Sequence, residues 1–199
     1  FKESPPDQTT VSQVTKDKVK DVFFHEDPKI NSDLRKIYNQ ELKVKDVIDV
    51  DLIISFGYRK IIKNNILARI KKPIINLHMS YLPYNRGSHP NFWSFIDKTP
   101  KGVTIHEISN GIDAGDIIFQ RQYEFNISLE KFSTFKKTYI FLFKALENLF
   151  IENFEKIINY SYSRKKQGNF YTIHRAIDLP KDLTNWNTNI QVYLKKNNK

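Results

Sequence analysis

The sequence predicts an α/β protein with three layers, in which helices cover both faces of a predominantly parallel sheet. Short apolar segments alternate along the chain with segments of helical periodicity, as is typical of strands joined by crossover helices. One apolar segment, Asp51–Phe56 (DLIISF), is almost continuous, as expected for a parallel strand covered on both faces. A later region, residues 128–158, carries apolar side chains at spacings of three and four, which indicates a helix packed on the sheet.

The elements expected before residue 70 follow a strand-then-helix order. Lys20–Phe24 (KDVFF) predicts a short strand, and Asn31–Leu42 predicts a helix with polar residues near its start. Asp51–Phe56 predicts the second strand, which ends at Gly57, and Ile61–Arg69 has the spacing of a second helix.

The remaining elements continue this alternation. Pro73–Met79 (PIINLHM) predicts a strand, and a loop of turn-forming residues follows it. The next expected elements are a helix, two strands and a long helical region, in the order Asn91–Ile96, Gly102–Ile108, Asp116–Phe125 and Ser128–Ile158. From Gln167 onward the sequence is too irregular for an assignment.

We interpret residues 1–160 as one domain and residues 161–199 as a C-terminal extension that packs on it. A chain of 199 residues, 40% of them hydrophobic, is long enough for one substantial core. The chain begins at Phe1 in a polar stretch without an initiator Met, so we expect this domain to lack its first strand and helix.

Composition excludes several kinds of chemistry but leaves the partner open. The chain contains no Cys, which excludes a disulfide, a thiolate nucleophile and a Cys-ligated zinc. Without an apolar run long enough to span a bilayer or a secretory signal pattern, we expect a cytoplasmic protein with no membrane partner. The net charge of +10 favours nucleic acid, an acidic membrane face or a small phosphorylated substrate, although an AT-rich genome would also produce this Lys-rich composition.

Three polar residues are candidates for a catalytic centre. Asn76 and His78 lie two apart in a predicted strand, so both side chains point to one face at its carboxyl end, where open α/β sheets place their ligands. Asp113 lies in a loop between Gly111 and Gly115 and could reach the same crevice. Taken singly, each has an ordinary structural explanation: an Asn that satisfies backbone groups, a packed His, and an Asp that caps a turn.

In their order along the chain, these residues and their neighbours resemble the formyltransferase family that uses 10-formyltetrahydrofolate. The resemblance is close from Asp51 to Tyr123 and loose outside this range. The segments that carry it are Phe56–Ile62 (FGYRKII), Asn76–Pro83 (NLHMSYLP), Arg86 with Gly87, Gly102–His106 (GVTIH) and Gly111–Ile117 (GIDAGDI). The resemblance implies a three-layer, Rossmann-like formyltransferase fold, an N-formyltransferase activity, and a catalytic domain over residues 1–160.

The resemblance further implies that Asn76, His78 and Asp113 are the catalytic residues. An amine that attacks a formyl carbon creates an oxyanion and an ammonium, and the folate nitrogen must be protonated before it leaves. His78 and the Asn76 amide can each donate a hydrogen bond to the oxyanion. If Asp113 lies close to His78, it would raise the pKa of His78 and help to relay the amine proton. This chemistry requires neither a covalent intermediate nor a metal.

The co-substrate implied by the resemblance is 10-formyltetrahydrofolate. Its expected binding residues belong to the segment that follows the second strand and to the loop around Asp113: Phe56, Gly57, Tyr58, Lys60, Ile61, Ile62, Ile112, Ala114 and Gly115. Ile61 and Ile62 are equally suited to a place in the core.

The stretch Tyr81–Trp93 resembles the corresponding loop of sugar-nucleotide N-formyltransferases. The candidate substrate-binding residues in it are Tyr81, Tyr84, Asn85, Arg86, Gly87 and His89. Arg86 could meet a diphosphate, and Tyr84 could stack on a nucleobase or sugar. Asn85 or His89 could form hydrogen bonds with sugar hydroxyls.

Several aromatic residues near these motifs have structural explanations. We interpret Trp93 as a packing residue beneath the loop and His106 as a structural residue in the middle of its strand. Tyr171 and Trp186 in the tail could serve a homodimer interface, but a place in the core explains them equally well.

These features predict an enzyme that formylates a nucleotide-linked amino sugar, namely a dTDP-linked 3- or 4-amino dideoxy sugar of a bacterial surface polysaccharide such as the O-antigen of lipopolysaccharide. The expected partners are this sugar nucleotide and a reduced folate, without nucleic acid. An alternative within the same chemistry is the formylation of glycinamide ribonucleotide in purine synthesis. Formylation of methionyl-tRNA fits less well, because too few residues follow Phe150 to build a separate C-terminal domain. The alternative from another class is a non-catalytic nucleic-acid-binding protein with this fold.

Overall fold

The computed structural model describes residues 21–23, 52–58 and 60–197, and the contacts within the chain divide it into two compact units, residues 1–75 and 76–199. Each unit is described by itself. The helix predicted at Asn31–Leu42 lies outside the described residues. The prediction of one domain over residues 1–160 with a C-terminal extension stays a prediction.

The first unit contains two strands that pair in parallel. β1 (Asp21–Phe23) lies beside β2 (Ile53–Phe56), with Asp21 opposite Ile53. All four residues of β2 are buried, which agrees with the prediction of a strand covered on both faces. Next to β2 in the sheet comes β3 (Ile74–His78), whose first two residues belong to this unit.

The helix predicted at Ile61–Arg69 is much shorter than expected. Only α3 (Asn64–Leu67) is helical, and its N-cap residue, Lys63, offers no side-chain hydrogen bond to the first turn. Asn is also a poor helix former, so little in the sequence favours extending this single turn. The periodicity alone overestimated the length of the helix.

In the second unit, the end of β3 is followed in strand order by β5 (Lys101–Glu107) and β6 (Ile117–Tyr123). The last two strands are antiparallel, and their register shifts between Ile105 and His106. The α/β class predicted from the sequence is confirmed, but the sheet is mixed. The loop between β5 and β6 is too short for the crossover helix that a parallel pair requires.

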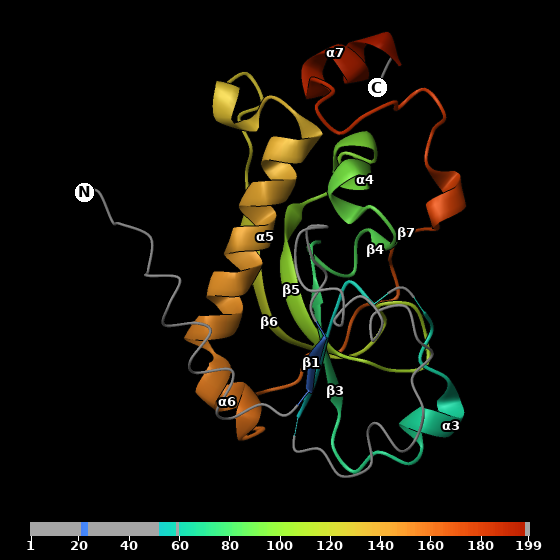
Figure 1. The fold of residues 1–199 in the computed structure, drawn as a ribbon, viewed down its shortest axis with the longest axis vertical. Coiled ribbons are helices and arrows are strands. Elements are labelled where there is room, and N and C mark those ends of the chain that lie inside the picture. Colours follow the sequence, from blue (N-terminus) through green and yellow to red (C-terminus); the bar gives the residue numbers. More distant parts are fainter. Residues whose placement is uncertain (1–20, 24–51, 59, 198–199) are drawn as a thin grey trace, which may run out of the picture. The chain divides into compact units, whose positions relative to one another are not determined.

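The helical periodicity of residues 128–158 is divided among three elements: a 3₁₀ turn at Glu130–Phe132, α5 (Phe135–Glu152) and α6 (Phe154–Ile158). Thr134 caps the start of α5 by accepting a hydrogen bond from the backbone N–H of Lys137. Asn153 interrupts the region because its amide donates to the Leu149 carbonyl at 2.9 Å, which competes with the helical pattern. The apolar face of α5 packs along β5 and β6, as predicted (Figure 1).

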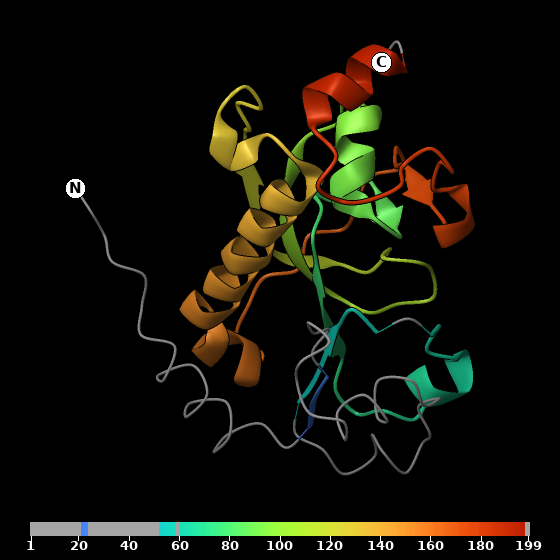
Figure 2. The same ribbon diagram turned by 45° about the horizontal axis from the view of Figure 1, so that its top comes forward.

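An aromatic cluster joins α5 to two further helices, α4 (Pro90–Ile96) and α7 (Ile190–Lys196). Figure 2 shows α7 lying against α4. The buried members of the cluster are Phe92, Trp93, Phe95, Ile96, Phe135, Ile190 and Tyr193. The packing role predicted for Trp93 is therefore confirmed. The tail that had no assignment from sequence supplies α7 and part of this core.

The tail also contributes a strand to the loop that follows β3. β4 (Arg86–Gly87) pairs in parallel with β7 (Ile173–His174), and a 3₁₀ turn at Ala176–Asp178 comes after β7. At Gly87, φ is +87°, and a Cβ atom would lie 2.2 Å from the carbonyl oxygen of His174. Only glycine fits this position. A pair of two-residue strands is too short to produce any periodicity in the sequence. In the part of the chain that the structure describes, none of the helices combines the length and apolarity needed to cross a membrane.

We expect the Phe135→Ala variant to lower the free energy of unfolding by about 3–5 kcal/mol, because it opens a cavity in the aromatic cluster. Phe135 is fully buried, with its ring centroid 5.0 Å from that of Phe92 and 5.7 Å from that of Tyr193. The measurement is chemical denaturation followed by circular dichroism. The control is Ile140→Ala on the same helix, where the side chain is 43% exposed and the expected change is below about 1 kcal/mol. Equal losses in both variants would show that the cluster does not stabilise the unit.

Candidate active site

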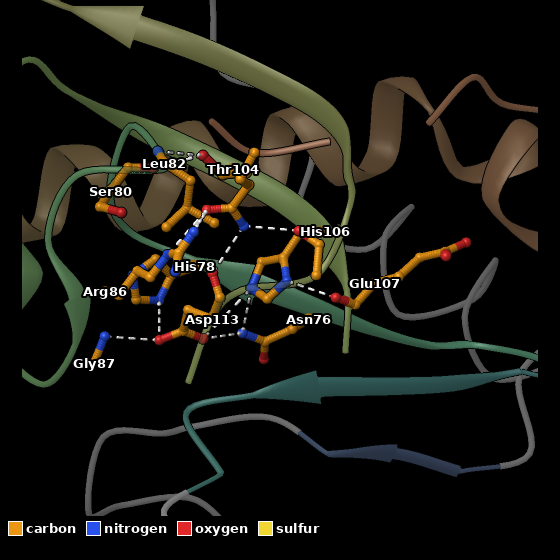
Figure 3. Close-up of polar contacts among 12 residues, drawn as sticks. Asn76, His78, Ser80, Leu82, Arg86, Gly87, Thr104, His106, Glu107 and Asp113 are labelled. Atoms are coloured by element: carbon orange, nitrogen blue, oxygen red, sulfur yellow. Dashed lines mark hydrogen bonds and ion pairs between the residues drawn. The ribbon is translucent and has the colours of Figure 1, made fainter. Parts of the chain in front are cut away.

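The three predicted catalytic residues meet around the carboxylate of Asp113 (Figure 3). Asn76 and His78 project from the end of β3, and Asp113 reaches them from the loop between β5 and β6. The Asn76 amide donates to Asp113 Oδ1 at 3.1 Å, and the backbone N–H of Gly87 donates to Oδ2 at 2.8 Å. His78 Nδ1 lies 3.6 Å from the same Oδ2. The strand period of two and the glycine-flanked loop therefore located the cluster correctly.

The loop that carries Asp113 is held tightly against β5. Asp113 has φ of +46°, a left-handed conformation that is uncommon for a residue other than glycine. Two residues on, a Cβ atom at Gly115 would lie 1.7 Å from the carbonyl oxygen of Glu107, so the loop can approach the strand only because this residue is glycine. The Asp113 side chain is 16% exposed and faces into the unit.

The environment of His78 decides which of its ring nitrogens carries the proton. Nε2 lies 3.1 Å from the carbonyl oxygen of Asn85, and a carbonyl oxygen can only accept, so Nε2 carries the hydrogen. In the neutral ring, the free lone pair is then on Nδ1, which faces Asp113 Oδ2. His78 thus offers a proton acceptor to the site rather than a donor.

The net pKa shift of His78 is downward, opposite to the sequence-based expectation. Burial of the ring lowers the pKa most strongly; the Asp113 carboxylate raises it, and His106 lowers it further. The predicted influence of Asp113 therefore has the right direction, but burial outweighs it. Because the ordinary pKa of His is about 6.5, His78 is neutral at pH 7.

The carboxylate of Asp113 stays ionised. Burial alone would raise its pKa, but the charge interaction with His78, the interactions with His106 and the hydrogen bond from Gly87 together hold the pKa well below its usual range. The site therefore combines a neutral imidazole with a permanent negative charge.

His106 belongs to the site, although we had interpreted it from sequence only as a structural residue. Its side chain is almost completely buried, and its Nε2 lies 3.4 Å from Asp113 Oδ1. Nδ1 lies 2.8 Å from the carbonyl oxygen of Glu107, so Nδ1 carries the hydrogen and Nε2 accepts from the Asn76 amide at 3.0 Å. The sequence contained a signal for His106. It lies two residues after the polar Thr104 in an apolar strand, and the same spacing identified Asn76 and His78.

Both hydrogens of the Asn76 amide are engaged in this arrangement, one with Asp113 and the other with His106. The opposite orientation of the amide would place its oxygen against two acceptors, which fixes the assignment. A hydrogen bond from Asn76 to an oxyanion, as expected from sequence, therefore requires the amide to give up one of these partners.

Two predicted substrate-binding residues, Asn85 and Arg86, direct their side chains into the protein in this structure. The Asn85 side chain is buried at 1% exposure; its Nδ2 donates to Asp97 Oδ2 at 3.1 Å, and its Oδ1 accepts from Thr99 Oγ1 at 2.6 Å. With both ends of the amide satisfied inside the protein, Asn85 supports the loop instead of reaching a sugar. Its left-handed backbone, with φ of +55°, turns the side chain inward.

Arg86 likewise points into the protein rather than toward a diphosphate. Its Nε and one terminal nitrogen donate to Gln167 Oε1 at 3.0 and 2.7 Å, and its guanidinium carbon lies 4.3 Å from the ring centroid of Tyr171. The guanidinium is therefore part of the internal scaffold. Neither Gln167 nor Tyr171 carried a sequence signal that linked it to this loop.

The other predicted substrate-binding side chains are less deeply buried than those of Asn85 and Arg86. Tyr81, Tyr84 and His89 are half-buried. The ring of Tyr84 lies edge-on to that of Phe170 with centroids 5.9 Å apart, and the ring of His89 lies 5.3 Å from that of Trp186. Aromatic side chains from the tail thus extend the surface that the loop provides.

The predicted folate-binding residues fall in both units. In the first unit, Phe56 is buried, Gly57 and Tyr58 are half-buried, and Lys60 is exposed. Ile61 is 76% exposed, which excludes the alternative of a core position for it, whereas Ile62 is half-buried.

In the second unit, Ile112 is 42% exposed, Ala114 is half-buried and Gly115 is buried. Their places in the loop beside Asp113 agree with the sequence-based expectation of contacts made through its backbone. The binding roles of these residues in both units stay predictions.

Comparisons with known proteins show similarity to formyltransferases. A family model described as Formyl transferase matches residues 4–137. The dTDP-4-amino-4,6-dideoxyglucose formyltransferase of Mycobacterium bovis is 32% identical over 124 residues, which cover 62% of this chain and 50% of that protein. The methionyl-tRNA formyltransferase of Listeria monocytogenes is 38% identical over 85 residues, which cover 42% of this chain and 27% of that protein. The chain thus spans about half the length, or less, of these curated relatives.

A solved structure is similar over more of its length. The formyltransferase PseJ from Anoxybacillus kamchatkensis, in complex with UDP-4,6-dideoxy-4-formamido-L-AltNAc and tetrahydrofolate, is 35% identical with a TM-score of 0.73. The match covers 85% of this chain and 95% of PseJ.

We expect the pKa of the His78 imidazole, measured by NMR titration, to lie below about 6.5, and to fall further in the Asp113→Asn variant. The variant removes the carboxylate that raises this pKa and leaves the burial that lowers it. Glu124→Gln, at an exposed position, is the control for the loss of one negative charge and should leave the pKa unchanged. A rise of the pKa in Asp113→Asn would contradict the arrangement described here.

Proposed function

The chain belongs to the formyl transferase family, and from this premise we propose that it transfers a formyl group from 10-formyltetrahydrofolate to the amino group of a nucleotide-linked amino sugar. The observation that carries the proposal is the convergence of three side chains, with His78 Nδ1 3.6 Å from Asp113 Oδ2 and the Asn76 amide donating to Asp113 Oδ1. The pair of His78 and Asp113 can accept a proton from an amine and hold the resulting charge. The relatives supply the class of acceptor.

The substrate class follows from what the relatives are named for. The curated mycobacterial relative is named for a dTDP-linked 4-amino-4,6-dideoxy sugar, and the PseJ structure contains a UDP-linked sugar with a 4-formamido group. Both names describe a nucleoside diphosphate attached to a deoxy sugar with nitrogen at position 4. We therefore favour the 4-amino member of the predicted 3- or 4-amino dideoxy sugars, and we include UDP-linked sugars beside the dTDP-linked ones.

In the proposed mechanism, the amine of the sugar attacks the formyl carbon while His78 Nδ1 takes up the amine proton. The imidazolium that forms is stabilised by Asp113, whose Oδ2 lies 3.6 Å away and is already ionised. The same proton can then pass to the folate nitrogen as this group leaves. Asn76 stabilises the oxyanion by redirecting one of its two N–H groups, while the other continues to hold Asp113 or His106.

The finer parts of the prediction belong to the same proposal. We place the reaction in the cytoplasm of a bacterium, where it would supply a formamido sugar for a surface polysaccharide such as the O-antigen of lipopolysaccharide. A homodimer also stays a prediction. The similarity to methionyl-tRNA formyltransferase covers only 27% of that protein, so it favours the shared folate chemistry and not a tRNA substrate.

We expect mass spectrometry to detect the gain of one formyl group on a 4-amino sugar nucleotide incubated with the protein and 10-formyltetrahydrofolate. The panel contains dTDP- and UDP-linked 3- and 4-amino sugars and glycinamide ribonucleotide. His78→Ala should reduce the rate by at least about 100-fold, because it removes the proton acceptor, and Glu124→Gln should retain activity. Formylation of glycinamide ribonucleotide alone would show that the enzyme acts in purine synthesis. Failure to bind tetrahydrofolate would refute the proposal.

The pH dependence of kcat/KM provides a second test. If His78 acts as the base, activity is full where the imidazole is neutral and declines as the pH falls through its pKa. Because burial lowers this pKa, we expect the decline to begin below about pH 6.5. In Asp113→Asn, the residual activity should decline at a still lower pH. A decline at a higher pH in this variant would show that another group controls the profile.

A further inference from the structure

One side chain from the C-terminal region joins the two loops that build the site. Gln167 Nε2 donates to the carbonyl oxygen of Asp113 at 2.8 Å and to that of Gly115 at 2.7 Å. Its Oε1 accepts two hydrogen bonds from the Arg86 guanidinium, at 3.0 and 2.7 Å. Both ends of one amide are therefore fully engaged, one with each loop.

The Asp113 loop has a physical need for such support. Asp113 has a left-handed backbone conformation that costs conformational energy and persists only where surrounding contacts enforce it. Asn76 and Gly87 hold its carboxylate, but those hydrogen bonds leave the backbone itself free to rotate. The two hydrogen bonds from Gln167 hold the carbonyl of Asp113 and that of the residue two positions later, so they fix the turn itself.

The segment around Gln167 is anchored on both sides, so the amide is held in place. Before it, Lys165 and Ile117 exchange two backbone hydrogen bonds, each 2.9 Å long. After it, the backbone N–H of Asn85 donates to Thr172 Oγ1 at 2.7 Å, and that of Arg86 donates to the Thr172 carbonyl at 2.9 Å. The anchors lie in β6 and in the loop that contacts His78 through the Asn85 carbonyl.

We propose that Gln167 is a positioning residue that sets the separation between Asp113 Oδ2 and His78 Nδ1. It acts through the backbone of Asp113 on one side and through Arg86, next to Asn85, on the other. The proposal rests on the proposed function for its kinetic consequence, but the placement of Asp113 against His78 can be measured without any turnover.

The test compares Gln167→Glu with Gln167→Leu. A carboxylate retains the acceptor for Arg86, which keeps it ionised, but it cannot donate to the carbonyls of Asp113 and Gly115 and is repelled by them. Leu removes both functions at a similar size. If Gln167 only anchored the tail through Arg86, Glu would be harmless and Leu would not. If it positions Asp113, both variants should be impaired.

The matched control is Gln122→Leu, the same chemical change at an exposed position of β6. The spectroscopic readout is the pKa of His78 measured by NMR. In Gln167→Leu, it should fall toward the value of Asp113→Asn, because a displaced carboxylate raises the imidazole pKa less. Gln167→Glu is assessed by kcat, because its own carboxylate also raises the imidazole pKa. In Gln122→Leu it should match that of the unchanged protein.

The kinetic readout is a fall in kcat of about 10- to 100-fold in both Gln167 variants, with KM for the sugar nucleotide largely unchanged. A wild-type kcat in Gln167→Glu, or a wild-type His78 pKa in Gln167→Leu, would overturn the proposal. If the unchanged protein formylates no acceptor, the proposed function fails, but the His78 titration still decides the role of Gln167.

Discussion

The ionised carboxylate of Asp113 is the constraint on which the rest of the site depends. A carboxylate removed from water is stable only where hydrogen-bond donors replace its hydration. Asn76 in β3 and Gly87 in β4 donate to the two oxygens of Asp113, which itself lies in the loop between β5 and β6. Three elements must therefore converge on one pair of oxygen atoms before the group can remain charged.

This convergence explains why the loop after β3 has so little freedom. Gly87 must donate its N–H to Asp113 while its Cα lies against the His174 carbonyl, and no side chain fits between them. The neighbouring residues, Asn85 and Arg86, direct their polar groups inward to Asp97, Thr99 and Gln167. A loop that looks from sequence like a binding surface is thus partly a support for the carboxylate, and its aromatic residues are left to face a ligand.

The two histidines differ in which ring nitrogen carries the hydrogen, because each ring contacts a different backbone carbonyl. His78 gives its Nε2 hydrogen to Asn85 and keeps a free Nδ1, whereas His106 gives its Nδ1 hydrogen to Glu107 and keeps a free Nε2. The two rings lie with their centroids 6.1 Å apart beside the Asp113 carboxylate. The free Nδ1 of His78 lies 3.6 Å from Asp113 Oδ2. The position of the backbone carbonyls, and not the pattern of side chains in the sequence, determines which nitrogen of each ring is free.

The sequence by itself determined the features that depend on short-range rules. The apolar run of β2, the amphipathic face of α5 and the alternation that aligns Asn76 with His78 all follow from the geometry of single elements. The order of motifs along the chain then indicated the family, and it predicted which residues form the candidate catalytic cluster. The same alternation rule could have placed His106 in the cluster. A His in the middle of a strand also has an ordinary packing explanation, and we chose that explanation from the sequence.

Only the tertiary structure decided the pKa of the histidine in that cluster and which residues hold the cluster in place. The downward pKa shift of His78 depends on how deeply it is buried relative to the charge of Asp113, which no local pattern reports. The β4–β7 pair and the Gln167 bridge join residues far apart in sequence through two-residue strands or a few hydrogen bonds. Contacts of this kind leave no periodicity to detect, because they are specified by packing of the whole unit and not by any one segment.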